Sequence, residues 1–195
     1  LVAPGGSLVV ATQEGIGRAC LAMTSFIFEE VAGQNLSATH LVAVNRDEAT
    51  MEVKPGEAFG QGLAIVVRFI ATGSFIRRFG LYAEDGRRLS GPLVEITLKD
   101  DQRGDPLINE DTLVELALAD RDQIEEIKAK AKKIAGFIQE HGRKKGLEIY
   151  DLKMEFGLAD DGRIMLIDEI SPGSMRAFAG DKRVEGPALA KAFVG

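Results

Sequence analysis

Charged side chains alternate with apolar ones in residues 149–157. Asp151, Lys153 and Glu155 occupy every second position, and the residues between them are apolar or aromatic. Because side chains of a β-strand point to opposite faces with a period of two, this pattern predicts a strand with one charged and one apolar face. A second acidic segment, Asp168-Glu169, follows after a glycine-containing turn. Carboxylates that are buried together need a cation or a partner, so the pattern indicates a site for a metal and a phosphate group.

The turn between the two segments decides which carboxylates meet. If it is a two-residue turn at positions 160–161, Lys153 lies opposite Asp168, and Glu155 and Asp168 become diagonal neighbours about 7–8 Å apart at Cα. These two carboxylates could then share a divalent cation. If the turn is a three-residue loop with a bulge, the pairing slips by one residue and Glu169 takes the place of Asp168.

We favour the two-residue turn because the alternative places apolar side chains on the charged face, namely those of Met165, Ile167 and Ile170. A purely structural explanation also stands at this point. Lys153, Glu155 and Asp168 would then form a ladder of cross-strand salt bridges on a solvated sheet. The charged strands alone do not separate the two explanations.

A second group of polar residues suits an anion. Arg68 lies near the end of an apolar segment that runs into Thr72-Gly73-Ser74, where a helix is expected to start. Backbone N–H groups, a serine hydroxyl and an arginine are donors that bind phosphate in proteins. Arg176 follows Ser171-Pro172 and could reach the same anion. Taken alone, Thr-Gly-Ser is also typical of an ordinary turn with a helix cap.

Length and composition indicate a soluble globular protein. A chain of 195 residues suits one domain, or two lobes around a cleft. No apolar run is long enough to cross a bilayer, and a net charge of -6 argues against a nucleic-acid surface. With no visible secretory leader, we expect a cytoplasmic protein. The chain opens at Leu1 rather than at a methionine, as expected of a fragment or of a chain that lacks a segment.

Hydrophobic periodicity and turn residues predict an α+β protein. Strands are expected at residues 8–11, 41–44, 50–53, 63–69 and 94–98 and in the two charged segments. Those at 41–44, 50–53 and 63–69 are expected to pair as an antiparallel sheet. Helices are expected at 18–32, at 109–118 and from Asp120 onward, where Gln123 completes a capping box. The apolar stripe of this last helix consists of Ile124, Ile127, Ala131, Ile134 and Ile138.

The polar motifs occur in a characteristic order along the chain. They are Arg68-x-x-x-Thr72-Gly73-Ser74, Lys99-Asp100-Asp101, Asp105-Pro106 with Asn109-Glu110, Asp151-x-Lys153-x-Glu155-Phe156-Gly157 and Asp168-Glu169-x-Ser171-Pro172. This ordered set resembles the SAICAR synthetase family, the phosphoribosylaminoimidazole-succinocarboxamide synthases of purine biosynthesis. The similarity extends from about Gly15 to Arg176.

The resemblance implies a two-lobed α+β fold related to ATP-grasp and kinase-like architectures, with antiparallel sheets and flanking helices. Residues 1–70 would form the remainder of an N-terminal lobe that covers the nucleotide, and residues 71–195 a C-terminal lobe with the substrate and metal residues. The family uses ATP and Mg²⁺ to join the carboxylate of CAIR, a phosphorylated aminoimidazole ribonucleotide, to the amine of L-aspartate. A homo-oligomer is compatible with the resemblance, and neither nucleic acid nor membrane is an expected partner.

The resemblance also implies a role for each matched residue. The implied catalytic residues are Lys153, Glu155 and Asp168, of which Glu155 and Asp168 would hold Mg²⁺ and the nucleotide. The implied substrate-binding residues are Arg68, Ser74 and Arg176, at the phosphate and carboxylate of the ribonucleotide, and Asp151, which with Lys153 would border its imidazole ring. Lys99 corresponds to a residue near the ATP phosphates.

The chain also departs from the family pattern. Nothing before Gly15 matches the Gly-Lys-x-Lys-like segment that covers the ATP phosphates in the family. Phe69 stands where an Asn or Arg is usual, and Gly173 where an Asp is usual. Two further functions therefore stay open: a divergent ligase that activates another carboxylate, and a nucleotide-binding homologue without turnover.

Overall fold

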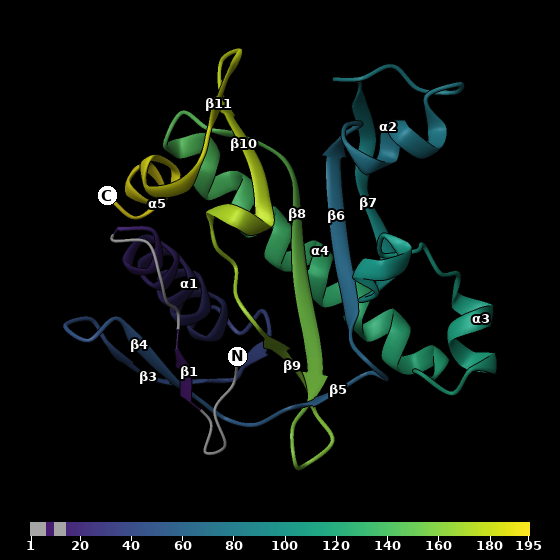
Figure 1. Ribbon diagram of the computed structural model, residues 1–195, viewed down its shortest axis with the longest axis horizontal. Coiled ribbons are helices and arrows are strands. Elements are labelled where there is room, and N and C mark those ends of the chain that lie inside the picture. Colours follow the sequence, from purple (N-terminus) through teal and green to yellow (C-terminus); the bar gives the residue numbers. More distant parts are fainter. Residues whose placement is uncertain (1–6, 10–14) are drawn as a thin grey trace.

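The computed structural model describes residues 7–9 and 15–195 and confirms the predicted α+β class (Figure 1). Of the strand expected at 8–11, positions 8 and 9 belong to β1 (Ser7–Val9), and positions 10 and 11 lie outside the described residues. The helices are α1 (Ile16–Gly33), α2 (Ser74–Phe79), α3 (Glu110–Glu115), α4 (Arg121–Lys144) and α5 (Gly186–Val194). Within the described ranges, no helix is both long and apolar enough to span a membrane.

The main sheet runs in the order β11-β10-β8-β6-β7, and the short strands β5, β9 and β2 extend it beside β8. Its strands are β2 (Ala38–Thr39), β5 (Glu57–Ala58), β6 (Leu63–Ile70), β7 (Arg88–Leu98), β8 (Glu148–Leu158), β9 (Ile164–Ile167), β10 (Met175–Ala179) and β11 (Lys182–Val184). β6 and β8 are central and pair antiparallel over five residues, Arg68 lying opposite Asp151 at one end and Ala64 opposite Glu155 at the other.

A small second sheet has the order β1-β4-β3, with β3 at Leu41–Asn45 and β4 at Thr50–Val53. The expected antiparallel sheet of 41–44, 50–53 and 63–69 is therefore correct for its first two strands and wrong for the third. The segment 63–69 belongs to β6 in the main sheet, where seven of the eight β6 residues are buried. An apolar run buried on both faces suits a central strand, whereas an outer three-stranded sheet buries one face.

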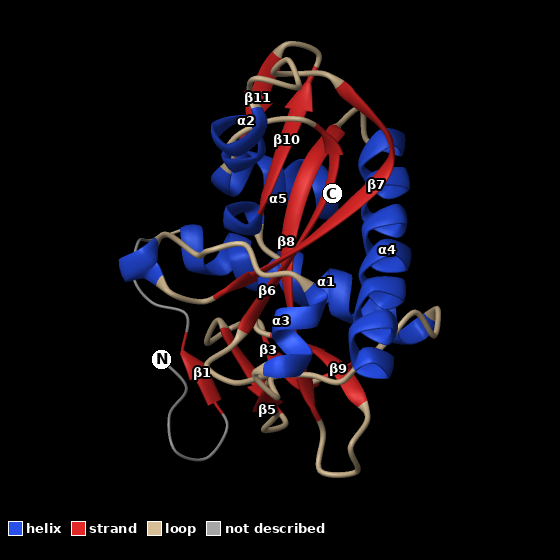
Figure 2. Ribbon diagram, turned by 90° about the vertical axis from the view of Figure 1, so that its right-hand side faces the viewer, coloured by secondary structure: helices blue, strands red, loops and turns tan. Residues whose placement is uncertain are grey.

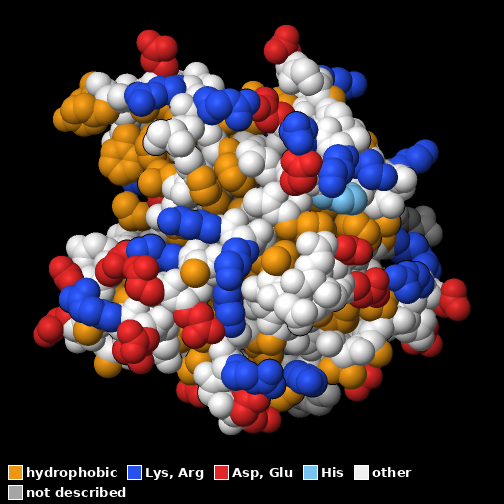
Figure 3. Space-filling view, turned by 180° about the vertical axis from the view of Figure 1, so that it is seen from behind, with side chains coloured by type: hydrophobic (Ala, Val, Ile, Leu, Met, Phe, Trp, Pro, Cys, Tyr) orange, Lys and Arg blue, Asp and Glu red, His pale blue; other side chains and the backbone are white. Residues whose placement is uncertain are grey.

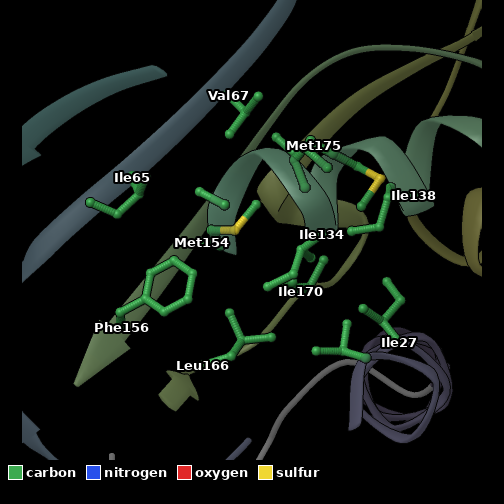
Figure 4. Close-up of a cluster of buried hydrophobic side chains, with 14 of the residues drawn as sticks. Ile27, Ile65, Val67, Ile134, Ile138, Met154, Phe156, Leu166, Ile170 and Met175 are labelled. Atoms are coloured by element: carbon green, nitrogen blue, oxygen red, sulfur yellow. The ribbon is translucent and has the colours of Figure 1, made fainter. Parts of the chain in front are cut away.

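The hydrophobic core fills the space between α4 and one face of the main sheet (Figure 2). The predicted capping box of Asp120 and Gln123 is present at the start of α4, and every member of its predicted apolar stripe is buried. Figure 4 shows Ile134 of α4 near Met154 of β8 and Ile138 of α4 beside Met175 of β10, with Ile27 of α1 in the same cluster. The core contains residues from both sides of position 70, and the division into two lobes there stays a prediction.

The hairpin of β8 and β9 has the register that we did not favour. Glu155 pairs with Ile167 and Leu158 with Ile164, and the N–H of Ala159 donates to the carbonyl oxygen of Arg163 at 2.9 Å around a three-residue loop. The expected pairing of Lys153 with Asp168 is thus wrong. Glycines remove the objection to this register. At Gly56 a Cβ would lie 2.7 Å from Met165, and at Gly157 it would lie 3.1 Å from Ile167, so the apolar side chains occupy space that the glycines leave.

Glu169 nevertheless does not replace Asp168 beside Glu155. β9 ends at Ile167, and Asp168 has a positive φ of 62°, which turns the chain away from the strand direction. The Glu169 carboxylate accepts a hydrogen bond from the Ser171 hydroxyl at 2.8 Å instead.

Truncation of Ile134 to Ala should lower the free energy of unfolding by about 2–5 kcal/mol, because the side chain is completely buried between α4 and the sheet. Denaturant unfolding followed by circular dichroism would measure the change. Lys133→Ala, at the exposed neighbouring position of α4, is the control and should change stability by no more than about 0.5 kcal/mol. Equal stability of both variants would contradict this account of the core.

Candidate functional site

A row of charged side chains crosses the face of the main sheet opposite α4. Register places Asp151 of β8 between Arg68 of β6 and Arg176 of β10. Side chains at paired positions of neighbouring strands lie on one face. The Asp151 carboxylate accepts from Arg68 Nη1 at 2.6 Å and from Arg176 Nη1 at 2.7 Å. One carboxylate therefore connects two predicted substrate-binding arginines.

Ser74 belongs to the same group. Its hydroxyl oxygen accepts from Arg68 Nη2 at 2.7 Å, and Ser74 is the first residue of α2, as the sequence predicted. All four predicted substrate-binding residues thus lie within one hydrogen-bonded cluster. We call this set the anion cluster: Arg68, Ser74, Asp151 and Arg176.

Gly73 shapes the cluster from the loop before α2. It has a φ of 59°, a conformation that glycine adopts without strain, and a Cβ at this position would lie 2.4 Å from Arg176 Nη1 and Nη2. The guanidinium group of Arg176 therefore rests against a backbone that only glycine leaves open.

Two members of the charged row, Glu95 and Arg78, were not among the residues predicted from the sequence. Glu95 of β7 is 6% exposed and accepts from Arg68 Nε and from Arg78 Nη2, both at 2.6 Å. The signal was present, since Glu95 and Thr97 alternate with apolar residues in β7 in the same way as the charges of β8. β7 had been predicted only from residue 94, and no motif directed attention to Glu95.

Burial raises the pKa of Asp151 above the ordinary aspartate value, although Arg176 and Arg68 both act to lower it. The desolvation of this carboxylate is therefore not fully offset by its two arginines. An anion near the arginines would compete with Asp151 for their N–H groups. The arginines are therefore firmly paired in the structure and could still donate to an added anion.

The second polar cluster lies further along β8. Glu155 Oε2 accepts from Lys99 Nζ at 2.9 Å, and Lys153 Nζ lies 3.8 Å from Glu155 Oε1. The Asp168 carboxylate lies close enough to raise the pKa of Glu155 and that of Lys99. The structure thus brings together the four residues predicted for catalysis, nucleotide and metal. Lys153 and Lys99 are partly exposed, whereas the Glu155 side chain is 7% exposed.

The pKa values of Glu155 and Lys99 are both raised by the neighbouring carboxylates. Burial raises the pKa of Glu155, the Lys99 hydrogen bond opposes this, and Asp168 adds a further increase. Burial alone would lower the pKa of Lys99, but Glu155, Asp168 and Asp105 together raise it. The two neighbouring carboxylates share one hydrogen-bonded lysine, Lys99, and one partly exposed lysine, Lys153, at 3.8 Å, so a further cation beside them would favour their ionised forms.

Glu155 and Asp168 fit a magnesium ion that is shared with phosphate groups. Glu155 Oε1 is buried and has no hydrogen-bond partner within the described residues. No group of three or more His, Cys, Asp or Glu residues in this part of the chain could enclose a metal. Mg²⁺ is commonly held by one or two carboxylates together with waters and substrate phosphates, and an unpartnered oxygen beside a second carboxylate supplies that donor set.

The backbone of Asp168 is held by a histidine. His40 Nε2 lies 3.2 Å from the carbonyl oxygen of Asp168, and the His40 ring packs against Phe28 with ring centroids 5.4 Å apart. Burial lowers the pKa of His40, although the Asp168 carbonyl opposes this. The neutral ring can donate to the carbonyl, which helps to fix the left-handed conformation of Asp168 at the end of β9.

The two clusters share one face and lie about 13 Å apart along β8, given about 3.3 Å per residue from Asp151 to Glu155. An anionic substrate could occupy one cluster while phosphates and a metal occupy the other. A groove of about 1070 Å³ runs beside β7 and is lined by apolar residues, among them Phe75 and Phe79 of α2, and by five charged residues, among them Glu95 (Figure 3). The groove therefore adjoins the charged row at Glu95.

Gly73→Ala should weaken the binding of inorganic phosphate by about tenfold, because the added Cβ displaces Arg176 from the cluster. Isothermal titration calorimetry would measure the affinity. Gly86→Ala is the matched control: Gly86 also has a positive φ, of 80°, but its Cβ would meet nothing within 4 Å. If Gly86→Ala weakened phosphate binding as much as Gly73→Ala does, backbone strain and not displacement of Arg176 would explain the loss of affinity.

Glu155→Gln should raise the melting temperature of the metal-free protein at pH 8 by roughly 2–4 °C. The pKa of Glu155 is raised on folding, so the folded state loses stability as the pH rises above the unfolded value of 4.5, and the loss is complete once the pH exceeds the folded pKa. The gain should disappear below about pH 4. Differential scanning calorimetry in the presence of EDTA would test this, with Glu52→Gln at an exposed position as control. A lower melting temperature at pH 8 would contradict the account.

Known proteins resemble this chain over most of its length. A sequence model of the family described as SAICAR synthetase matches residues 9–194. The phosphoribosylaminoimidazole-succinocarboxamide synthase of Clostridium tetani is 43% identical over 192 residues, which cover 98% of this chain and 84% of that protein. The enzyme of the same name from Finegoldia magna is 36% identical over 171 residues, 88% of this chain and 71% of its own length.

Solved structures agree as well. A structure described as SAICAR synthetase superimposes with a TM-score of 0.80 at 34% identity and covers 91% of this chain and 80% of its own. A SAICAR synthetase in complex with ADP gives a TM-score of 0.79 at 28% identity, over 90% of this chain and 72% of its own. With the family model matched over nearly the whole chain, this protein belongs to the SAICAR synthetase family.

Proposed function

We propose that this protein is the ATP-dependent ligase that joins the carboxylate of CAIR to the amine of L-aspartate and forms SAICAR in purine biosynthesis. The observation that carries the proposal is the presence of two complementary clusters on one sheet face, an arginine-rich one for an anionic substrate and an acidic one for Mg²⁺ and nucleotide phosphates. Family membership and the ADP complex of a relative support the same assignment.

The reaction requires prior activation of the carboxylate. An amine that attacks a free carboxylate would have to expel an oxide, which is a very poor leaving group. A carboxylate oxygen of CAIR therefore attacks the γ-phosphorus of ATP, which gives an acyl phosphate and ADP. The aspartate nitrogen then attacks the carbonyl carbon, a C–N bond forms, the C–O bond breaks, and inorganic phosphate leaves. The protein must bring three anionic molecules together and compensate their charge.

Arg176 and Ser74 of the anion cluster would bind the phosphate of CAIR, and Arg68 would orient both. Asp151 would hold the two arginines and face the imidazole ring, where its carboxylate can accept from the amino group. Binding the substrate at this distance from the acidic cluster would place the CAIR carboxylate toward Lys153. A partly exposed lysine there can neutralise the reacting carboxylate as it approaches the nucleotide.

Glu155 and Asp168 would hold Mg²⁺, which when bound supplies positive charge to the phosphate oxygens. Lys99 Nζ, now paired with Glu155 Oε2, could turn toward the nucleotide phosphates. Part of its side chain is exposed, so this movement needs no repacking of the core. His40 would keep the Asp168 backbone in position throughout.

The departures from the family pattern do not favour another carboxylate substrate. Phe69 is 7% exposed and packs in the hydrophobic core, away from the charged row. At Gly173 an added Cβ would meet only the Ser171 hydroxyl oxygen, at 3.6 Å, so the backbone there is compatible with a side chain such as the usual aspartate. Neither change removes a donor from the two clusters.

Glu155→Gln should reduce turnover by about 10²–10³-fold or more and weaken the binding of Mg-ATP, because a neutral amide holds Mg²⁺ poorly. Phosphate release in the presence of CAIR, L-aspartate and Mg-ATP measures the first effect, and calorimetry with Mg-ATP measures the second. Glu52→Gln, exposed on β4, should retain wild-type activity.

The same assay distinguishes the other two functions. Phosphate release by the wild type that requires both CAIR and L-aspartate supports the proposal. Release only with another acid would indicate a divergent ligase, and none with any acid, despite binding of Mg-ATP, would indicate a homologue without turnover. Full activity of Glu155→Gln would remove Glu155 from the mechanism.

A further inference from the structure

The hydrogen bonds of Arg68 leave it little capacity for a ligand. An arginine side chain has five N–H groups. In Arg68, Nε donates to Glu95 at 2.6 Å, Nη1 donates to Asp151 at 2.6 Å and to the Thr72 carbonyl oxygen at 3.4 Å, and Nη2 donates to Ser74 at 2.7 Å. One N–H group remains. A bidentate contact with a phosphate needs two, so Arg68 alone cannot provide it.

The two arginines at the ends of the row have more donors to offer. Within the described residues, Arg176 donates to Asp151 and Arg78 donates to Glu95, each through a single nitrogen. Their side chains are 31% and 28% exposed, whereas that of Arg68 is 3% exposed. Arg78 and Arg176 thus stand in the same relation to Arg68, each held by a carboxylate and each partly open to solvent.

The charges of the row do not balance. Three guanidinium groups and two buried carboxylates alternate in the order Arg78, Glu95, Arg68, Asp151, Arg176. The row therefore carries one net positive charge, on a face where much of it is shielded from solvent. An anionic group beside it would complete the alternation, and the exposed ends are where it can enter.

The geometry of α2 places Arg78 on the side of the anion cluster. Ser74 and Arg78 are four residues apart and share one face of the helix. Phe75 and Phe79 form the neighbouring stripe, with ring centroids 5.0 Å apart, and line the apolar groove. The helix thereby directs Arg78 and Ser74 toward the charged row and its two phenylalanines toward the groove.

We propose that Arg78 is a further binding residue for the phosphate group of CAIR and that Glu95 is the positioning residue that holds Arg78 and Arg68 in place. This inference rests on the proposed function, since it assigns the site to CAIR. Glu95 suits the role because its two oxygens are divided between the two arginines, Oε2 to Arg68 and Oε1 to Arg78.

Arg78→Ala should raise the KM for CAIR about 10- to 100-fold with kcat changed less than about threefold, as expected for loss of a charge-assisted contact far from the reacting carboxylate. Arg77→Ala, at the exposed neighbouring position of the same helix, is the matched control and should leave both constants within about twofold. Arg78→Gln keeps most of the aliphatic stem and replaces the alanine variant if that one does not fold.

The nucleoside that lacks the 5′-phosphate separates a phosphate contact from a general disturbance. Wild type should prefer CAIR over this nucleoside in kcat/KM, and Arg78→Ala should lose about 10- to 100-fold of that preference. Glu95→Gln should lose part of the same preference because both arginines lose their charged partner. Glu95→Asp, which keeps the charge, should restore more of it than Glu95→Gln does.

An unchanged preference for CAIR in Arg78→Ala, equal to that of Arg77→Ala, would overturn the assignment of Arg78. A lost preference in Arg78→Ala with full preference in Glu95→Gln would overturn the positioning role of Glu95. Both outcomes differ from failure of the proposed function, in which the wild type releases no phosphate with CAIR and L-aspartate. In that case the affinity for CAIR is measured by calorimetric titration into wild type and into Arg78→Ala. Equal affinity of the two proteins for CAIR, or no binding of CAIR to wild type, would overturn the inference.

Discussion

The sharing of the Asp151 carboxylate between Arg68 and Arg176 is the interaction on which the arrangement of the site depends. A guanidinium group that is 2% exposed, in the middle of a sheet, is tolerable only if its charge is paired and its donors are satisfied. Asp151 meets this need from β8 and Glu95 meets it from β7. The same pairing joins β6, β7, β8 and β10 through their side chains.

The acidic cluster follows a different principle. The anion cluster is largely satisfied by its own hydrogen bonds, whereas Glu155 Oε1 is buried beside a second carboxylate, 3.8 Å from Lys153 Nζ, and accepts no hydrogen bond from the described residues. Such an arrangement costs folding free energy in the absence of a cation, and a ligand that brought positive charge to the folded protein would offset that cost. Local instability at functional residues is common in proteins, and here it lies where the proposed mechanism needs positive charge. One face of the sheet thus carries two clusters: the anion cluster, whose hydrogen bonds are largely satisfied, and the acidic cluster, whose hydrogen bonds are not.

Local signals in the sequence predicted the fold class, the capped helix α4 and the charged strand β8, whereas Lys99 and the roles of the site residues were implied by the family resemblance. Alternation identified the charged face of β8, and Asp120 with Gln123 identified the start of α4. The hairpin register failed for a physical reason: the glycines that accommodate Met165 and Ile167 lie at positions 56 and 157, and the contact across β5 and β8 is invisible in the sequence. Glu95 was missed because its partner Arg68 is 27 residues away in the chain.

The predicted register is wrong, yet Glu155 and Asp168 are neighbours in the structure. The predicted register made Glu155 and Asp168 neighbours by regular strand pairing, whereas in the structure β9 ends at Ile167 and a left-handed residue brings the Asp168 carboxylate back toward Glu155. Such a conformation costs about 1–3 kcal/mol for a residue other than glycine and persists only where its surroundings hold it. His40 is one such support. Tertiary contacts therefore hold the Glu155 and Asp168 carboxylates together at some energetic cost. Selection would keep such a costly arrangement if the two carboxylates had to bind one cation.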